Sequence, residues 1–526
     1  TGTQNVTITG TGNDTVALGS GNNNVNTGGG SDTVTGTVQL GDQVDLDADN
    51  DSFAYQTLAG DVRGGAGTDT ITIASGAGPV SLNLNVAAGN GNYSGFENIS
   101  AAGADGAVTA TAVTGGSTID TGSAADNVTA GAGTDLINTG SGTDTINITS
   151  GTYANDTLNG GADSDTLAIT GGGIANISTG VTVSNIENVS IDATATTFTA
   201  NNDALAITAG NGGNTITLGS GTQSVTAGTG ADTVNLGAGN NNVNTGGGSD
   251  TVNGTLDAAD VVDLDAGNDS FAYQTLAGDV RGGAGSDTIT YSGSTAITLD
   301  LTVTQAATRY SGFENITATG TGAITATASV DGGAINTAAG DDIVTLNVGV
   351  DTANLGSGND TISGIGAGDQ ITLGDGSDTA TYAAAAGALV DAGESVETAG
   401  GDILNLTSAG PLTINLAASG SNQITGGSGD WRNFENLSAG ASGGALTVTA
   451  DTVGSVITTG SGNDNVTAGG NSVRADNINT GAGTDTINIT SGTYAGDTLN
   501  GGADSDTLAI TGGGIVNIST GVTVSN

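Results

Sequence analysis

The sequence predicts an all-β protein, a long parallel β-solenoid with coils of about 18 residues. Three observations predict this fold: tandem nine-residue repeats, Asp residues that recur every second repeat, and a composition poor in large side chains. A nine-residue unit cannot bury its own apolar residue, whereas stacked units bury theirs against one another. Stacking therefore turns these repeats into one thin, continuous core.

The repeat is a nonapeptide with two physically different parts. Five consecutive copies fill residues 209–253, three fill 9–35 and three fill 121–147. The first six residues of a copy are rich in Gly, which permits positive φ and a tight turn. The last three alternate, as in Thr-Val-Asn, which predicts a short strand with its middle residue pointing inward. Single copies occur at 64–72, 282–290, 355–363 and 480–488.

The acidic residue at position six of the repeat has a period of its own. It recurs at spacings of 18 or 19 in Asp14, Asp32, Asp51 and Asp69, in Asp232, Asp250, Asp269 and Asp287, and in Asp342, Asp360 and Asp378. The nonapeptides between them often carry an amide instead, as at Asn23, Gln223 and Asn241. One coil is therefore two nonapeptides, with Asp stacked along one edge and amides along the other. Block 121–147 differs, because it has Asp on both edges.

The composition excludes several classes of protein. The chain has 95 Gly but only 6 Phe, 8 Tyr and 1 Trp, which suits a thin core. Its 53 acidic residues face 5 basic ones, giving a net charge of −48. We do not expect such a chain to bind nucleic acid, since phosphate binding needs Lys and Arg. No apolar run approaches the roughly 20 residues that span a bilayer, so no membrane insertion is expected.

The charge requires cations, and the turns offer oxygen ligands for them. Hard divalent cations prefer oxygen, and Ca²⁺ takes six to eight such ligands. Neighbouring coils lie about 4.8 Å apart, so Asp side chains and turn carbonyls from successive coils can share one ion. The sequence thus predicts many Ca²⁺ ions, with these ligands: Asp14, Asp32, Asp51, Asp69, Asp126, Asp135, Asp144, Asp165, Asp232, Asp250, Asp269, Asp287, Asp342, Asp360, Asp378, Asp464, Asp476, Asp485 and Asp506.

The copies GGAGTDTIT at 64–72 and GGAGSDTIT at 282–290 resemble the nonapeptide GGxGxDxUx of the RTX (repeats-in-toxin) family. The resemblance covers the nonapeptide blocks, well under half of the chain. It implies a calcium-binding parallel β-roll and export by a one-step (type I) secretion system without an N-terminal signal. It also implies folding outside the cell, because the family typically stays unfolded in the low-calcium cytosol. The motif does not specify function, since toxins, proteases, lipases, adhesins and surface-layer proteins all carry it.

A second signature, Phe or Ile followed by Glu-Asn, divides the chain into larger modules. It reads GFENIS at 95–100, NIENVS at 185–190, GFENIT at 312–317 and NFENLS at 433–438. We expect the apolar residue to fill the core and Glu-Asn to satisfy turn amides; a lateral contact or an extra cation site is the alternative. The predicted modules are a partial one at 1–96, a short one at 97–186, long ones at 187–313 and 314–434, and a truncated one at 435–526.

The chain lacks His, Lys and Cys, the usual acid–base and nucleophilic groups, so we expect no enzyme activity. Long near-identical modules suit a protein whose task is length or tiling. The leading hypothesis is an extracellular structural protein at the bacterial cell surface that assembles with itself into a layer or filament. A cell-surface polysaccharide is a further candidate partner. The alternatives are the stalk of a giant RTX adhesin and an ice-binding β-solenoid with Thr-Gly-Asn columns.

Overall fold

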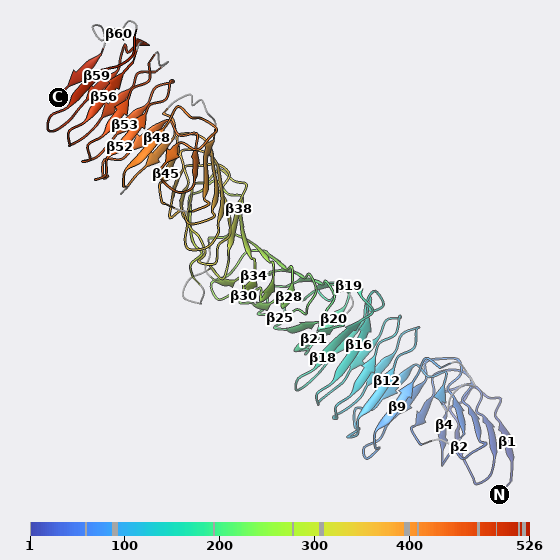
Figure 1. The fold of residues 1–526 in the computed structure, drawn as a ribbon. Coiled ribbons are helices and arrows are strands. Elements are labelled where there is room, and N and C mark those ends of the chain that lie inside the picture. Colours follow the sequence, from blue (N-terminus) through green and yellow to red (C-terminus); the bar gives the residue numbers. More distant parts are fainter. Residues whose placement is uncertain are drawn as a thin grey trace. The chain divides into compact units, whose positions relative to one another are not determined.

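The computed structural model describes residues 2–57, 60–86, 93–192, 195–275, 278–303, 310–384, 386–393, 400–407, 410–470, 474–490, 492–513, 516–517 and 522–526. Every regular element in them is a β-strand, and nearly all strand pairs are parallel, which confirms the predicted all-β solenoid (Figure 1). The chain forms two compact units. Unit 1 is Thr1–Ala266 with Gln274–Asp279, and unit 2 is Gly267–Tyr273 with Val280–Asn526.

In unit 1, successive strands alternate between two parallel sheets, so one coil holds two strands and two turns. The first sheet contains β1 (Gln4–Thr7), β3 (Asn23–Asn26), β5 (Gln43–Asp45), β7 (Asp61–Arg63) and β10 (Tyr93–Ser94). The second contains β2 (Thr15–Ala17), β4 (Thr33–Thr35), β6 (Ser52–Ala54), β8 (Thr70–Thr72), β11 (Asn98–Ser100), β13 (Thr118–Asp120), β15 (Leu136–Asn138), β17 (Thr157–Asn159) and β20 (Thr182–Ser184).

The alternation continues through the rest of unit 1 with two further runs of strands. One contains β9 (Val80–Asn83), β12 (Val108–Thr111), β14 (Asn127–Thr129), β16 (Thr145–Thr149), β18 (Thr166–Thr170), β21 (Asn188–Ile191), β23 (Ala206–Ala209), β25 (Ser224–Thr226), β27 (Asn242–Asn244) and β30 (Val261–Asp263). The other contains β19 (Gly173–Asn176), β22 (Thr196–Thr199), β24 (Thr215–Thr217), β26 (Thr233–Asn235) and β29 (Thr251–Asn253).

Unit 2 repeats the same plan. One run contains β32 (Ser270–Ala272), β35 (Thr288–Tyr291), β38 (Asn315–Ala318), β40 (Ala334–Asn336), β42 (Thr352–Ser357), β44 (Gln370–Asp375), β46 (Leu389–Gly393) and β50 (Asp430–Arg432). A second contains β36 (Ile297–Asp300), β39 (Ile324–Thr327), β41 (Ile343–Thr345), β43 (Thr361–Ser363), β45 (Thr379–Thr381), β47 (Ile403–Asn405), β51 (Asn436–Ser438), β53 (Val456–Thr458), β55 (Asn477–Asn479), β58 (Thr498–Asn500) and β61 (Thr523–Ser525).

The remaining strands are shorter runs and pairs. Near the C-terminal end lie β49 (Ile424–Thr425), β48 (Leu412–Asn415), β52 (Leu446–Thr449), β54 (Asn465–Thr467), β56 (Thr486–Ile489) and β59 (Thr507–Ile510). β57 (Gly492–Thr493) pairs with β60 (Val516–Asn517). The others are β28 (Gly247–Gly248), β31 (Ala266–Gly267), β33 (Asp279–Arg281), β34 (Ala284–Gly285) and β37 (Tyr310–Ser311).

The core follows the predicted alternation. Ile119 of β13 aligns with Ile137 of β15, which aligns with Leu158 of β17, and all three are fully buried. Their strand neighbours, such as Thr118 and Leu136, face outward and are exposed. The core is therefore a stack of single aliphatic side chains, which explains how so few aromatic residues suffice.

Coil length varies more than the repeat predicts. Matching Asp residues lie 18 or 19 residues apart in the nonapeptide blocks, but the interval is 21 between Asp135 and Asp156 and 24 between Asp378 and Asp402. β48 also pairs antiparallel with β49, where the sequence loses its nonapeptide register. Insertions are absorbed in the turns, so the strand stack is kept. The five predicted modules stay a prediction.

Candidate metal centre

The Asp at position six directly precedes a strand, and its side chain reaches back to the preceding coil. The Oδ1 atom of Asp32 accepts the main-chain N–H of Asp14 at 2.8 Å, and that of Asp51 accepts the N–H of Asp32 at 2.7 Å. The Oδ1 atom of Asp69 likewise accepts the N–H of Asp51 at 2.8 Å. Asp32, Asp51 and Asp69 are buried. We call such a column an Asp ladder, because each carboxylate pins one coil to the next.

Every predicted Asp ligand lies in such a ladder. The ladders of unit 1 are Asp14–Asp32–Asp51–Asp69, Asp126–Asp144–Asp165, Asp135–Asp156 and Asp232–Asp250. Those of unit 2 are Asp269–Asp287, Asp342–Asp360–Asp378–Asp402, Asp351–Asp369, Asp464–Asp485–Asp506 and Asp476–Asp497. The sequence reasoning missed Asp156, Asp351, Asp369, Asp402 and Asp497, which lie in turns without the full glycine pattern. Each is followed by an outward residue and then an apolar one, as in Asp156-Thr-Leu, and that signal could have found them.

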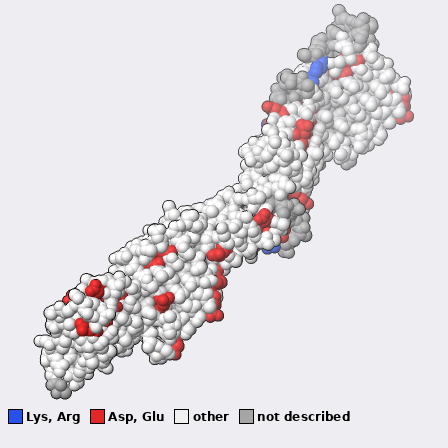
Figure 2. Space-filling view, turned by 180° about the vertical axis from the view of Figure 1, so that it is seen from behind, with Lys and Arg blue, Asp and Glu red and all other residues white. Residues whose placement is uncertain are grey.

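The burial of these acids also changes the surface. Figure 2 shows the red carboxylates of the face in view as separate patches on a mostly white surface. A chain with 53 acidic residues would otherwise carry a dense coat of charge. Much of the charge instead lies in the ladders, where water does not screen it.

In most ladder turns the second carboxylate oxygen, Oδ2, is buried and accepts no hydrogen bond from the described part of the chain. We call these open turns. They contain Asp32, Asp51, Asp69, Asp126, Asp144, Asp156, Asp165, Asp232, Asp287, Asp342, Asp360, Asp464, Asp485, Asp497 and Asp506. A buried, unpaired carboxylate oxygen is costly unless a proton or a cation compensates it.

A smaller group of turns satisfies both oxygens with main-chain amides. The Oδ1 atom of Asp135 accepts the N–H of Ser117 at 2.7 Å, and its Oδ2 atom accepts the N–H of Gly131 in its own turn, also at 2.7 Å. Asp476 is held in the same way by Ser455 and Gly469. We call these closed turns. The same own-turn bond to Oδ2 occurs at Asp42, Asp260 and Asp369.

A third kind of turn has Asn at position six. The Nδ2 group of Asn214 donates to the carbonyl oxygens of Gly210 at 3.1 Å and Gly212 at 2.6 Å, which are positions two and four of its own turn. Asn23 and Asn241 donate to the matching glycine carbonyls of their turns. We call these amide turns. The two carbonyls therefore accept a positively polarised group that approaches from position six.

The glycines at positions two and four are required by close approach between coils. A Cβ atom on Gly356 would lie 2.0 Å from the carbonyl oxygen of Ala338, and one on Gly358 would lie 1.8 Å from that of Gly340. Gly356 and Gly358 also have φ of +98° and +141°. Turn carbonyls thus point along the axis at the next turn, and glycine alone leaves room for them.

The Glu of the Phe/Ile-Glu-Asn signature follows the last Asp of four ladders and accepts its main-chain N–H. The Oε2 atom of Glu97 accepts the N–H of Asp69 at 2.8 Å, and Glu187, Glu314 and Glu435 do the same for the Asp that ends each ladder before them. The Oδ1 atom of Asn98 accepts an N–H from the following coil, and Phe96 is buried against Tyr93. These contacts confirm the structural interpretation of the signature, in which the apolar residue fills the core and Glu-Asn satisfies turn amides.

Burial raises the pKa of several ladder acids. It raises the pKa of Asp51 and Asp287 to about 6 and that of Asp360 to about 7. Neighbouring carboxylates add to these shifts, and main-chain hydrogen bonds oppose them. Burial likewise raises the pKa of Glu435 to about 7. These four groups therefore hold a proton at higher pH than ordinary carboxyl groups do, and a cation can take its place.

The open turns fit Ca²⁺ by the chemistry of their donors. Each supplies a buried carboxylate oxygen without a protein partner. The glycine carbonyls of the matching amide turns accept a positively polarised group, as at Asn214. Within the described residues, no three acidic side chains gather at one point, so carboxylates alone would not complete a coordination sphere. Main-chain oxygens would have to contribute, as Ca²⁺ commonly allows. Bound there, the ion would neutralise carboxylates and tie adjacent coils together.

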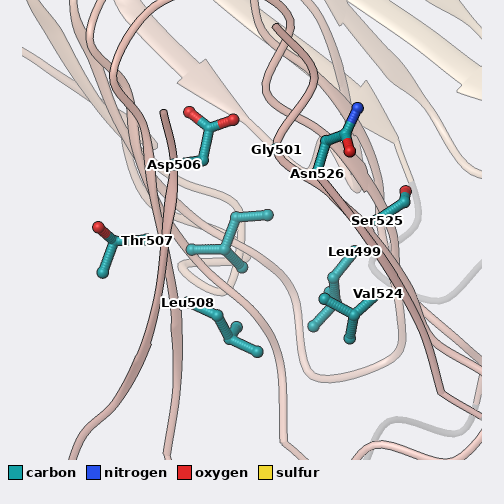
Figure 3. A pocket seen from close by; sticks show the side chains of 9 residues that line it. Leu499, Gly501, Asp506, Thr507, Leu508, Val524, Ser525 and Asn526 are labelled. Atoms are coloured by element: carbon teal, nitrogen blue, oxygen red, sulfur yellow. The ribbon is translucent and has the colours of Figure 1, made fainter. Parts of the chain in front are cut away.

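Figure 3 shows a pocket of unit 2 lined by Leu499, Leu508, Val524 and Asp506. It lies beside β59 and β61, which are the last strands of their runs. Residues 485–526 repeat 144–185 with two differences, Gly496 for Asn155 and Val516 for Ala175. In the earlier copy, β21 pairs with the strand that matches β59 and covers it. The pocket is thus an uncovered stretch of core, and we assign no functional site to it.

These features define a class: an all-β solenoid whose coils are joined by stacked Asp and Gly turns. A family model for the RTX calcium-binding nonapeptide repeat matches residues 8–37, 111–146, 150–168, 218–252, 345–380 and 491–509. The chain therefore carries RTX calcium-binding nonapeptide repeats, as the sequence resemblance indicated. No curated protein matches the chain. Among the described residues, no helix could cross a membrane.

Proposed function

We propose that the chain is a calcium-dependent extracellular structural protein that assembles with copies of itself into a cell-surface layer or filament. The observation that carries this proposal is the set of open turns. Buried carboxylate oxygens without protein partners recur coil after coil, so a cation is part of the fold. RTX repeats suggest a calcium-binding, secreted protein, and the cell surface is the place we propose for it.

Two features support a structural role. The repeats use their Asp residues to join coils, which leaves the ladder acids engaged with main-chain amides and unavailable as exposed catalytic groups. Long near-copies such as 144–185 and 485–526 repeat the same surfaces along the chain. Repeated surfaces favour periodic contacts between molecules, which a layer or a filament requires.

The test combines circular dichroism with sedimentation velocity, first in EGTA and then in millimolar Ca²⁺. We expect a largely disordered, expanded chain in EGTA that gains β-structure with Ca²⁺ and then forms large species. Folding without assembly would overturn the self-association and favour an adhesin stalk. A chain that is fully folded in EGTA and binds no Ca²⁺ would overturn the calcium-dependent fold itself.

A further inference from the structure

Two adjacent turns of unit 1, AGNGGN at 209–214 and AGTGAD at 227–232, keep the same glycines at positions two and four and differ at positions three, five and six. Asn214 and Asp232 occupy consecutive coils of one ladder and are both buried. The glycines at positions two and four avoid positive φ in both turns. They form a natural comparison between an amide turn and an open turn.

The two side chains use their first oxygen identically. The Oδ1 atom of Asn214 accepts the N–H of Thr196 at 3.0 Å, and that of Asp232 accepts the N–H of Asn214 at 2.6 Å. The remaining atom is Nδ2 in Asn214 and Oδ2 in Asp232. In Asn214 this atom donates to the carbonyls of Gly210 and Gly212, whereas in Asp232 it is a buried oxygen that accepts no hydrogen bond.

We infer that the amide of Asn214 does covalently what a bound cation does in the turn of Asp232. An N–H group offers the carbonyls positive polarisation, and a carboxylate oxygen offers them repulsion. The amide turns of Asn23, Asn214 and Asn241 are therefore complete without metal. The closed turns, such as that of Asp135, are complete as well, because main-chain N–H groups occupy both carboxylate oxygens.

The residue at position six and the bonds of its second side-chain atom thus decide whether a turn needs calcium. Open turns require the ion. Amide and closed turns join adjacent coils without a metal ion. Among the Asp residues that the sequence predicted as ligands, Asp135 and Asp476 then serve as structural residues. Asp156 and Asp497 join the calcium set, because their Oδ2 atoms are buried and unpartnered. This inference rests on the proposed calcium-dependent fold.

The test exchanges the chemistry of the two turns in the full chain. Asp232→Asn should remove about one bound Ca²⁺ per chain, because its new amide can donate to the turn carbonyls. Asn214→Asp should create a turn that requires the ion. Equilibrium dialysis counts bound Ca²⁺, and hydrogen exchange across a Ca²⁺ titration gives the concentration at which each segment becomes protected. We expect that concentration to fall about tenfold around residue 232 in the first variant and to rise about tenfold around residue 214 in the second.

Asp135→Asn is the matched control. It replaces a carboxylate oxygen that accepts the N–H of Gly131 with a donor, so it should weaken the turn equally with and without Ca²⁺ and leave the number of bound ions unchanged. The inference is overturned if Asp232→Asn binds as many ions as the parent, or if Asn214→Asp shows no added demand for Ca²⁺. A parent chain that binds no Ca²⁺ would instead overturn the proposed function.

Discussion

At the scale of the residue, one carboxylate performs two tasks. The Oδ1 atom of a ladder Asp pins its coil to the preceding one, and Oδ2 decides whether the turn is complete without an ion. Asp suits the first task because its short side chain reaches the main chain of a tight turn. Glu takes over only at the ends of ladders, where Glu97 and Glu314 follow the last Asp by 28 and 27 residues. Coil length alone does not select Glu, because Asp402 follows Asp378 by 24 residues and Glu187 follows Asp165 by only 22.

The raised pKa values predict an unusual response to acid when metal is absent. A carboxyl with an unfolded pKa of 3.8 and a folded pKa of about 6 to 7 binds protons more tightly in the folded state. Its stabilising effect is complete below the unfolded value and is lost as pH rises through the folded value. In EGTA we therefore expect β-structure and the thermal midpoint to increase from pH 7.5 to pH 5, followed by circular dichroism.

The contribution of one site can be isolated with Asp360→Asn, which should flatten this pH dependence. Saturating Ca²⁺ should also reduce it, because the ion competes with the proton. A thermal midpoint in EGTA that rises steadily from pH 5 to pH 7.5 would contradict the prediction.

The turn glycines give a second prediction at this scale. Gly358→Ala places a methyl group against the carbonyl of Gly340 at a φ of +141°. We expect it to destabilise its coil by at least about 1 to 3 kcal/mol, the usual cost of such a conformation before the clash is added. Local hydrogen exchange in Ca²⁺ measures the loss. Gly12→Ala is the control, since Gly12 holds the same position in a turn where an added methyl group would meet no atom within 4 Å, and equal effects of the two changes would refute the argument.

At the scale of the element, the unit of construction is a coil of two short strands and two turns. Its existence was predictable, because Thr-Val-Asn alternation and turn glycines recur at fixed spacing, and the register of Ile119 with Ile137 follows from that spacing. The distinction between Asp135 and Asp144 was not predictable from the repeat. It depends on whether a main-chain N–H of the turn points at the carboxylate, which is a property of local backbone conformation. The antiparallel β48–β49 pair was also beyond prediction, because no repeat sets its register.

The ladder ends allow a prediction about the Glu signature. Removing the Glu97 side chain with Glu97→Ala leaves the N–H of Asp69 without its acceptor, which should cost about 1 to 3 kcal/mol at that coil. Glu97→Gln keeps a carbonyl oxygen and should cost less. Hydrogen exchange around residues 69 and 97 in saturating Ca²⁺ distinguishes the two variants. Equal losses would mean that the acceptor at Oε2 is unimportant and that packing of the side chain alone matters.

At the scale of the whole molecule, a net charge of −48 opposes folding until the carboxylates are neutralised. Most contacts link a coil only to its neighbours, so the free energy of folding is close to a sum over coils and their interfaces. The open turns spread the demand for cations along both units. Folding of the whole chain should therefore depend on the concentration and the identity of the cation.

Mg²⁺ should be a poor substitute for Ca²⁺. It demands octahedral geometry and gives up its waters reluctantly, whereas the open turns offer a buried carboxylate oxygen. At equal millimolar concentrations we expect Mg²⁺ to compact the chain by screening and Ca²⁺ to fold it. Small-angle scattering reports the size and circular dichroism reports the strands. Equal β-structure with both ions would show that charge screening alone is sufficient.

The direction of the ladder bonds has a consequence for the order of folding. The main-chain N–H of a ladder Asp finds its acceptor on the coil that follows it in the chain, as Asp69 does on Glu97 and Asp51 does on Asp69. The ladder bond of each coil therefore cannot form until the coil that follows it in the chain is in place. The coil that carries the signature Glu supplies the acceptor for the last Asp of the ladder. We therefore expect the ladder hydrogen bonds to form first at the signature and then coil by coil toward the N-terminus. This order is opposite to the direction in which a ribosome makes the chain.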